Sequence, residues 1–258
     1  MKKLILTFIA AFTSLFAFAI SNEELLKSAE EQTAFYGRDF KANYSITQEK
    51  PGQGMSNTEA IMYRRDDEGK WVILVTGPEK EKGKGYLQYE NTIWFYDPVD
   101  KRFTFTSAKD KFQGTNANNS DFTPQHYHRD YKIEKVDKVK LGKFDCALFT
   151  LKSKTDSVDY PMLKLWVTSD GLVRKKEDYS LSGQLLRTTA VPSYQKVTEG
   201  KRETFVPSKM VISDNLRGMK IGDKMQYERT QITVTNVSFA PQAATVYTKQ
   251  YLEMMSAK

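Results

Sequence analysis

Alternating apolar and polar residues predict β-strands along most of this chain. Phe40, Ala42, Tyr44 and Ile46 alternate with polar residues, which is typical of a strand with one buried face. Further strand-like runs follow, joined by turn sequences such as DDEG, EN and DPVD. The EN and DPVD connections are short enough to require hairpins, so neighbouring strands are expected to pair antiparallel. A second series of strands is predicted from Tyr131 to Phe239.

A helical pattern precedes the first strand. Residues 21–36 begin with Ser21 and Glu24 in the spacing of a capping box, and Gly37 is placed to end the helix. Its apolar positions form one narrow stripe. We therefore expect an amphipathic N-terminal helix that packs on the sheet.

Two further segments interrupt or follow the strands. Residues 108–130 are rich in Asn and Ser, and within them Thr123 and Pro124 suit the start of a short helix. Residues 240–258 carry large side chains at four-residue spacing, typical of one helix face: Tyr247, Tyr251 and Met255. The pattern predicts one domain, a large antiparallel sheet flanked by two terminal helices and a middle insert.

The strand in residues 92–97 is unusual because both of its faces are apolar. Ile93 and Phe95 lie on one face, and Trp94 and Tyr96 lie on the other. A sheet with two apolar faces needs cover on both sides. The pattern is consistent with a fully packed interior, which is the usual role of aromatic residues, or with a cavity for an apolar ligand.

The N-terminus has the features of a cleaved signal peptide. Lys2 and Lys3 precede an uncharged apolar run, residues 4–19, which ends in the small-x-small pattern Ala17-Phe18-Ala19. We expect residues 1–19 to be a signal peptide, cleaved after Ala19; a retained membrane anchor is the alternative. The chain is therefore expected to be exported.

The only cysteine bears on stability and on lipidation. Cys146 lies far from the predicted cleavage site, so the mature protein is expected not to be lipidated there, and one Cys excludes an internal disulfide. Because Cys146 lies in the apolar run FDCALFTL, it is interpreted as a small buried hydrophobic residue. The fold must then be stabilised by its core.

The charge of the chain is moderately basic and dispersed. The formal net charge is +7, which includes Lys2 and Lys3 of the predicted signal peptide. The densest lysine run, residues 79–85, also carries glutamates and is interpreted as a solvated loop. Without a clustered basic stripe, nucleic-acid binding is not expected. Weak attraction to anionic phospholipid head groups is compatible with this charge.

The sequence carries no recognisable catalytic, metal or cofactor motif. The two histidines, His126 and His128, lie after a predicted helix start, where residues two apart point in different directions, and no third ligand stands at a zinc-like spacing. Gly83 and Gly85 do not precede a helix and so do not suggest a phosphate-binding loop. No G-x-S-x-G motif is present. We expect neither catalysis nor a bound metal or cofactor.

The order of these segments resembles a known family. A signal peptide and an amphipathic helix are followed by GKGYLQYENTIWFYDPVDKRFTF, then by NNSDFT, RDYKI and LKLWVTSDGLVRKKEDYSLSGQLLRTT. This order is similar to that of the LolA-like outer-membrane lipoprotein-sorting proteins, which are periplasmic lipoprotein carriers. The resemblance covers most of residues 20–258, which we interpret as one LolA-like domain.

The resemblance implies a fold and a function. The expected fold is mainly β (α+β): an unclosed antiparallel β half-barrel with helices forming a lid over an apolar cavity. The expected function is that of a monomeric periplasmic carrier that binds the acyl chains of a lipoprotein or another lipid. An inner-membrane transporter would be the donor and an outer-membrane protein the acceptor. An exported interaction or lipid-sensing module with a filled core is the alternative, and a secreted hydrolase is less favoured.

The aromatic hairpin supplies candidate ligand-binding residues. The choice of face depends on a one-residue register that the sequence leaves open. The candidates for the lipid cavity are Trp94, Tyr96, Phe103 and Phe105. The candidates for the lid are Leu25, Phe122 and Tyr251.

Overall fold

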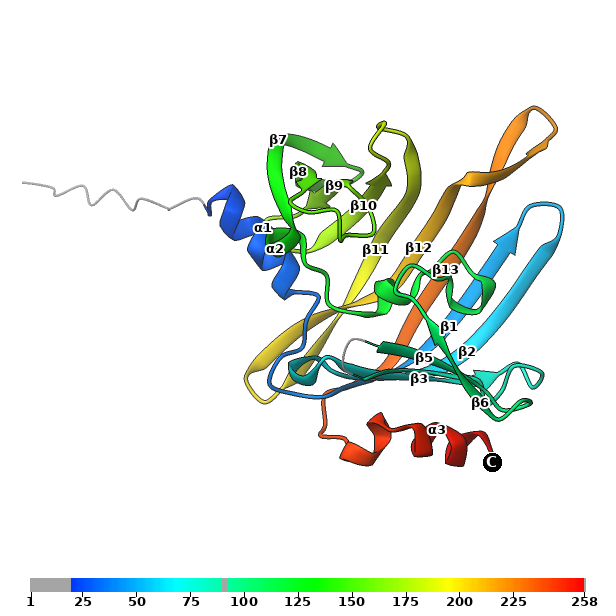
Figure 1. Ribbon diagram of the computed structural model, residues 1–258. Coiled ribbons are helices and arrows are strands. Elements are labelled where there is room, and N and C mark those ends of the chain that lie inside the picture. The colour runs from blue at the N-terminus through cyan, green and yellow to red at the C-terminus, as the bar shows by residue number, and fades with distance from the viewer. Residues whose placement is uncertain (1–19, 90–91, 258) are drawn as a thin grey trace, which may run out of the picture.

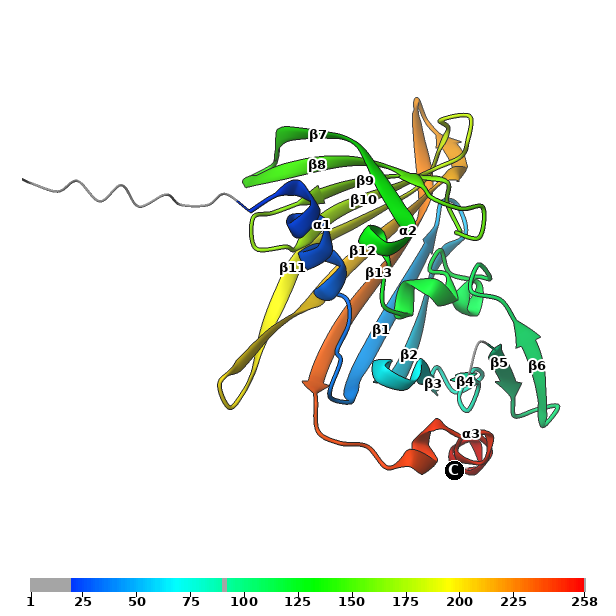
Figure 2. The same ribbon diagram turned by 60° about the vertical axis from the view of Figure 1, so that its left-hand side comes forward.

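The computed structural model of the chain describes residues 20–89 and 92–257, so the predicted signal peptide lies outside the described part. Its main feature is one curved antiparallel sheet of thirteen strands (Figures 1 and 2). The strands are β1 (Phe40–Lys50), β2 (Gly54–Arg65), β3 (Lys70–Gly77), β4 (Gly85–Tyr89), β5 (Thr92–Asp97), β6 (Arg102–Thr106), β7 (Tyr131–Leu141), β8 (Phe144–Ser153), β9 (Met162–Val167), β10 (Val173–Tyr179), β11 (Leu185–Glu199), β12 (Arg202–Ile221) and β13 (Lys224–Ser238).

The strand order explains why the sheet stays open. The sheet runs from β6 through β1, then from β13 through β7, so the pairing of β1 with β13 joins the two predicted series. The strands β6 and β7 form its two ends. This arrangement confirms the expected unclosed antiparallel half-barrel.

Short helices lie on both sides of the sheet. They are α1 (Asn22–Glu31), α2 (Tyr127–Asp130), α3 (Lys249–Ser256) and the 3₁₀ helices η1 (Asp66–Glu68), η2 (Phe112–Gly114), η3 (Asn119–Phe122) and η4 (Ala244–Tyr247). Helices α1 and α2 and the insert containing η2 and η3 lie on the concave side of the sheet, whereas α3 lies outside β3 (Figures 1 and 2).

The alternation predicted for the first strand is present in β1. Phe40, Ala42, Tyr44 and Ile46 are buried and the residues between them are partly exposed. These four side chains belong to a core cluster that fills the concave face of the sheet under the insert. The strand is held on both edges, since it pairs with β2 and β13.

The N-terminal helix begins as expected and ends earlier than expected. Ser21 and Glu24 form the predicted capping box. The helix ends at Glu31, however, and not near Gly37. The reason is the packing of Phe35, whose ring stacks on that of Phe40 with 4.6 Å between centroids. Burying this ring against the sheet turns the chain away from the helix axis.

The helix predicted to start at Thr123 and Pro124 begins later. Thr123 has extended backbone angles and follows η3, and its hydroxyl donates to the carbonyl oxygen of Ser120 at 2.9 Å. Its side chain therefore satisfies the preceding turn and does not cap a new helix. The short helix α2 starts at Tyr127.

Candidate functional site

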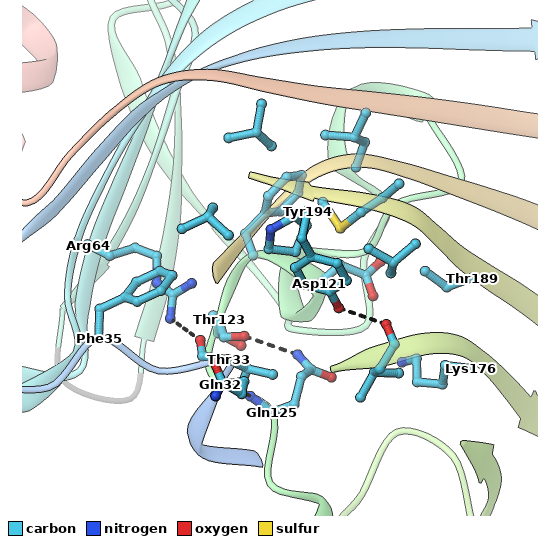
Figure 3. Close-up of a pocket in the computed structure, with 18 of the residues that line it drawn as sticks. Gln32, Thr33, Phe35, Arg64, Asp121, Thr123, Gln125, Lys176, Thr189 and Tyr194 are labelled. Carbon is cyan, nitrogen blue, oxygen red and sulfur yellow. Dashed lines mark hydrogen bonds between the residues drawn. The ribbon is translucent and has the colours of Figure 1, made fainter. Parts of the chain in front are cut away.

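A cavity of about 130 Å³ lies between the concave face of the sheet and the segments that cover it (Figure 3). The cover consists of the end of α1 and the chain that follows it, together with residues 121–127 of the insert. The floor is formed by strands β1, β2 and β10–β13. The lining is Ala29, Gln32, Thr33, Phe35, Phe40, Tyr44, Arg64, Asp121, Phe122, Thr123, Gln125, Tyr127, Val173, Lys176, Thr189, Val191, Tyr194, Val206, Pro207, Met210, Ile212, Ile232 and Val234.

Most of the lining is apolar because alternate residues of several strands point inward. Ile212 and Ile232 are almost completely buried on neighbouring strands of the floor. On the covering side, the ring of Phe122 packs edge-on against Tyr44 and Phe112, with centroids 5.9 Å and 5.0 Å away. Phe122, which was predicted to belong to the lid, therefore lies in the covering wall of this cavity.

A few hydrogen bonds hold the cover to the sheet. Arg64 Nη2 donates to the carbonyl oxygen of Thr33 at 2.9 Å, and the same side chain pairs with Asp66 at 2.7 Å. The backbone N–H of Gln125 donates to Thr33 Oγ1 at 2.8 Å and so joins the insert to the end of α1 (Figure 3). Glu30 Oε2 accepts two backbone N–H groups from the first turn of α2. Polar groups near Thr33 thus link the covering segments to the sheet and to one another, in addition to the apolar packing of Phe35 and Phe122.

A buried ion network stands at the side of the cavity. The Arg187 guanidinium donates to both oxygens of Asp121 at 2.6 Å and 2.9 Å, and to Asp178 at 2.9 Å. Lys176 Nζ lies 3.3 Å from the other Asp178 oxygen. Burial disfavours the ionised form of Asp121, but attraction to Arg187 and Lys176 outweighs it and holds the pKa of this carboxyl below its ordinary value. Two cations and two anions give this network no net charge.

Lys176 also borders a second, more polar hollow of about 350 Å³. This hollow lies between residues 120–131 and 157–160, and it shares four lining residues with the apolar cavity: Thr123, Gln125, Tyr127 and Lys176. Burial and nearby Arg129 lower the pKa of His126 in its wall, so this imidazole is neutral at pH 7. The apolar cavity therefore has a polar neighbour on the side of Lys176.

Two polar groups face the apolar cavity with unused hydrogen-bonding capacity. Lys176 and Thr189 are directly paired across β10 and β11, and both line the cavity (Figure 3). The hydroxyl of Thr189 is buried and has no hydrogen-bond partner within the described residues. The Lys176 ammonium has three donors, and Asp178 is its one ion-pair partner among the described residues. Such groups are the natural contacts for an acceptor atom of a ligand.

The aromatic residues predicted to line a lipid cavity lie elsewhere. Tyr96, Trp94 and Phe103 belong to a cluster under α3, on the opposite face of the sheet from the cavity. Phe105 packs against Trp94, with ring centroids 4.1 Å apart, and is 74% exposed. Ile93 and Phe95 are the β5 residues that point to the concave side. The concave face of β5 therefore carries Ile93 and Phe95, whereas the prediction had placed Trp94 and Tyr96 on that face.

The two remaining lid candidates also lie away from the cavity wall. Leu25 is buried between α1 and strands β8–β10, so it anchors the helix and does not line the cavity. Tyr251 lies on α3, and its hydroxyl donates to the Tyr63 hydroxyl at 3.2 Å. Since α3 covers the outer face of the sheet, Tyr251 is not placed over the concave side.

The cavity-lining polar residues on β10 and β11 were missed by the sequence reasoning. The available signal was weak: Lys176 and Asp178, two residues apart on one strand, share a face, and both point inward. A pair of opposite charges on a buried strand face is uncommon. Arg187 is the cross-strand partner of Asp178 in the β10–β11 hairpin, but Asp121 lies 66 residues before Arg187, so no local pattern links it to the network.

The residues considered for metal binding or reactivity have ordinary surroundings. His126 Nδ1 lies 4.0 Å from Glu30, and His128 Nε2 lies 3.5 Å from Glu23. The described residues contain no group of three or more His, Cys, Asp or Glu side chains placed to hold a metal ion. Cys146 is buried, and burial raises the pKa of its thiol, which disfavours the reactive thiolate. Across residues 20–89 and 92–257, no helix has the length and apolar character needed to span a membrane.

Comparisons with known proteins identify the fold. A family model described as an uncharacterized protein matches residues 67–254. Among curated proteins, none matches this sequence. A LolA superfamily protein from Nitrosomonas europaea is similar in structure, with a TM-score of 0.71 and 21% identity over 90% of this chain and 100% of that chain.

Two other solved structures have the same fold. A predicted outer membrane lipoprotein-sorting protein domain from Vibrio parahaemolyticus has a TM-score of 0.73 and 15% identity over 90% of this chain and 97% of that chain. A DUF1329 family protein from Desulfovibrio piger has a TM-score of 0.70 and 15% identity over 88% of this chain and 98% of that chain. At these identities the similarity establishes a LolA-like half-barrel.

Proposed function

This chain belongs to a family of uncharacterized proteins with the LolA-like fold, and from that premise we propose that it is a periplasmic, non-catalytic lipid carrier. It would bind the acyl chains of a lipoprotein or another lipid in the cavity under its cover and move them between membranes. The predicted signal peptide supports export. A membrane-bound donor and an outer-membrane acceptor are part of the proposal.

The observation that supports lipid binding is the apolar cavity between the sheet and its polar-bonded cover. Side chains such as Ile212, Val206 and Phe122 present an apolar surface, whereas the groups near Thr33 hold the cover closed. Burying one methylene group contributes about 0.8 kcal/mol, so a long acyl chain gains on the order of 10 kcal/mol before ordering costs. The cavity therefore offers binding energy without a reacting group.

The size of the cavity requires the cover to move when lipid enters. Its volume of about 130 Å³ is below the ~300–1,000 Å³ of ordinary ligand pockets. The polar hollow beside it has four lining residues in common with the cavity. Three of them, Thr123, Gln125 and Tyr127, belong to the insert, and the fourth is Lys176 on β10. A shift of the insert away from the sheet would join the two spaces. A larger combined space of this kind is what the proposed binding of an acyl chain needs.

The polar groups in the cavity indicate which part of a lipid they would contact. Lys176 and Thr189 both have hydrogen-bonding capacity left, so they suit a carbonyl oxygen. The ion network around Lys176 is already neutral, and a phosphate or carboxylate would add an unbalanced buried charge. An uncharged ester or amide, the group that links an acyl chain to the rest of a lipid or lipoprotein, suits the surroundings of Lys176 and Thr189 better.

Native mass spectrometry of the protein released gently from its host tests the proposal. We expect co-purified lipid, and we expect Val191→Trp, which fills the cavity, to remove it. Val99→Trp, in an exposed turn outside the cavity, is the matched control and should retain the lipid. Protein that is always empty and that fails to bind a fluorescent fatty-acid ester would contradict the carrier function.

A further inference from the structure

The tip of the β12–β13 hairpin carries large apolar side chains that the described residues leave exposed over much of their surface. Every residue from 216 to 227 is exposed. The hairpin extends to the upper right in Figure 1, beside the β1–β2 hairpin, where Met55 at the start of β2 is exposed. Met219 lies against Gly52 in the turn of the β1–β2 hairpin. The exposed large apolar residues of the tip are Leu216, Met219, Ile221, Met225 and Tyr227.

The apolar side chains of the tip lie on both faces of the hairpin. Lys220 is paired with Met225, and Ile221 with Lys224. Because side chains alternate along a strand, Met219 and Ile221 share one face while Met225 and Tyr227 share the other. An antiparallel hairpin that packs on a protein core commonly has one apolar face and one solvated face. Apolar residues on both faces suit a tip that is surrounded by an apolar medium.

Basic residues accompany these apolar side chains. The segment 216–227 contains Arg217, Lys220 and Lys224 against the single acid Asp223. Within the described residues, neither of the two lysines forms an ion pair, whereas Arg217 lies 3.8 Å from Asp214. The tip therefore combines exposed apolar groups with a net positive charge.

We propose that this hairpin docks the protein onto an anionic phospholipid surface, with the apolar side chains entering the interface and the lysines contacting head-group phosphates. The charge favours this surface over a second copy of the hairpin, which would bring the same positive charge against it. The inference goes beyond the lipid cavity and does not depend on it, because membrane binding can be measured whether or not the cavity holds a lipid.

Vesicle flotation tests the electrostatic part of the proposal. The exported protein is used, with its N-terminus verified by mass spectrometry, since a retained apolar segment would itself bind membranes. We expect binding to phosphatidylglycerol-containing vesicles that weakens with salt, and little binding to pure phosphatidylcholine. Lys220→Gln with Lys224→Gln should weaken binding about 30-fold. Lys80→Gln with Lys138→Gln removes the same charge from exposed sites elsewhere and should have little effect.

A second set of variants tests insertion of the apolar tip. Met219→Ser with Ile221→Ser should abolish flotation, whereas Leu181→Ser, at another exposed loop, should not. These positions are exposed, so folding, checked by circular dichroism, is expected to be unchanged. A polarity-sensitive dye on Met225→Cys in a Cys146→Ala background should shift to the blue when vesicles are added.

Three results would overturn membrane docking. One is the absence of binding to anionic vesicles by the unmodified exported protein. Another is equal binding by the hairpin variants and their controls. The third is a change of oligomeric state in the hairpin variants without a change in vesicle binding, which would assign the tip to self-association.

Discussion

The buried ion network beside the cavity makes a sharp prediction for Arg187→Met. Arg187 is 5% exposed and forms the only bridge in the network between Asp121, in the insert, and Asp178, on β10. Methionine fills a similar volume without charge. The variant would hold two carboxylates against one cation, Lys176. Removing one partner from a buried pair costs about 3–5 kcal/mol, so we expect this loss in the free energy of unfolding at pH 7.

The loss is measured by urea denaturation followed by circular dichroism. For a chain of this size it corresponds to a decrease of about 6–20 °C in the melting temperature. Asp121→Asn in the Arg187→Met background is the matched comparison. It leaves Lys176 and Asp178 as a neutral pair, so the double variant should be more stable than the single variant by roughly half of the loss. A double variant less stable than the single one would refute this account.

The pH dependence gives an independent check of the same reasoning. In the unmodified protein the pKa of Asp121 is below its ordinary value, so its contribution is complete above about pH 4 and is lost only as the pH falls through the folded-state pKa. Without Arg187, burial dominates and raises that pKa above its ordinary value. Folding of the variant then takes up a proton, and its stability deficit should shrink between pH 7 and pH 4.5. A deficit that grows on acidification would contradict the ion-network explanation.

Three further changes test the cavity and its cover. Thr189→Val removes a buried hydroxyl that has no partner among the described residues, so stability should be unchanged or higher. Binding of a fatty-acid methyl ester, measured by calorimetry, should weaken about five- to tenfold, whereas binding of a matched alkane should not change. Phe105→Asp, at an exposed site, should leave folding and lipid binding intact, whereas Phe122→Asp should lower both, as circular dichroism and a fluorescent-lipid assay would show. Arg64→Lys keeps a charge beside Asp66 but loses the forked guanidinium group that also reaches the Thr33 carbonyl, so amide hydrogen exchange near Thr33 should accelerate. Unchanged exchange would show that this contact does not hold the cover closed.

The parts of the fold that were predicted correctly depend on local patterns. The period of two along β1 predicts a strand buried on one face, and the structure shows the same alternation of buried and partly exposed residues from Phe40 to Ile46. The capping box of Ser21 and Glu24 is likewise a contact across three residues. The end of α1 was not predictable in this way, because it depends on the packing of Phe35 against the sheet.

The candidate site depends on contacts between distant residues, and these leave no local signal. Asp121 and Arg187 are 66 residues apart in the chain, and Gln125 meets Thr33 across 92 residues. Which face of the sheet a terminal helix covers likewise depends on contacts between residues far apart in the chain. The four-residue spacing that includes Tyr251 predicts one apolar helix face and is compatible with either side of the sheet.

The two apolar faces of β5 show why an aromatic strand is a poor marker for a ligand cavity. Ile93 packs under the insert, and Tyr96 packs under α3, so each face of this strand is covered by protein. The floor of the cavity has a different composition, since apolar residues such as Val191 and Ile212 share it with Lys176 and Thr189. A fully packed core excludes polar groups without partners, because leaving them unsatisfied costs free energy. Inward-facing polar residues with hydrogen-bonding capacity left, set among apolar ones, therefore indicate a ligand site more directly than the aromatic row does.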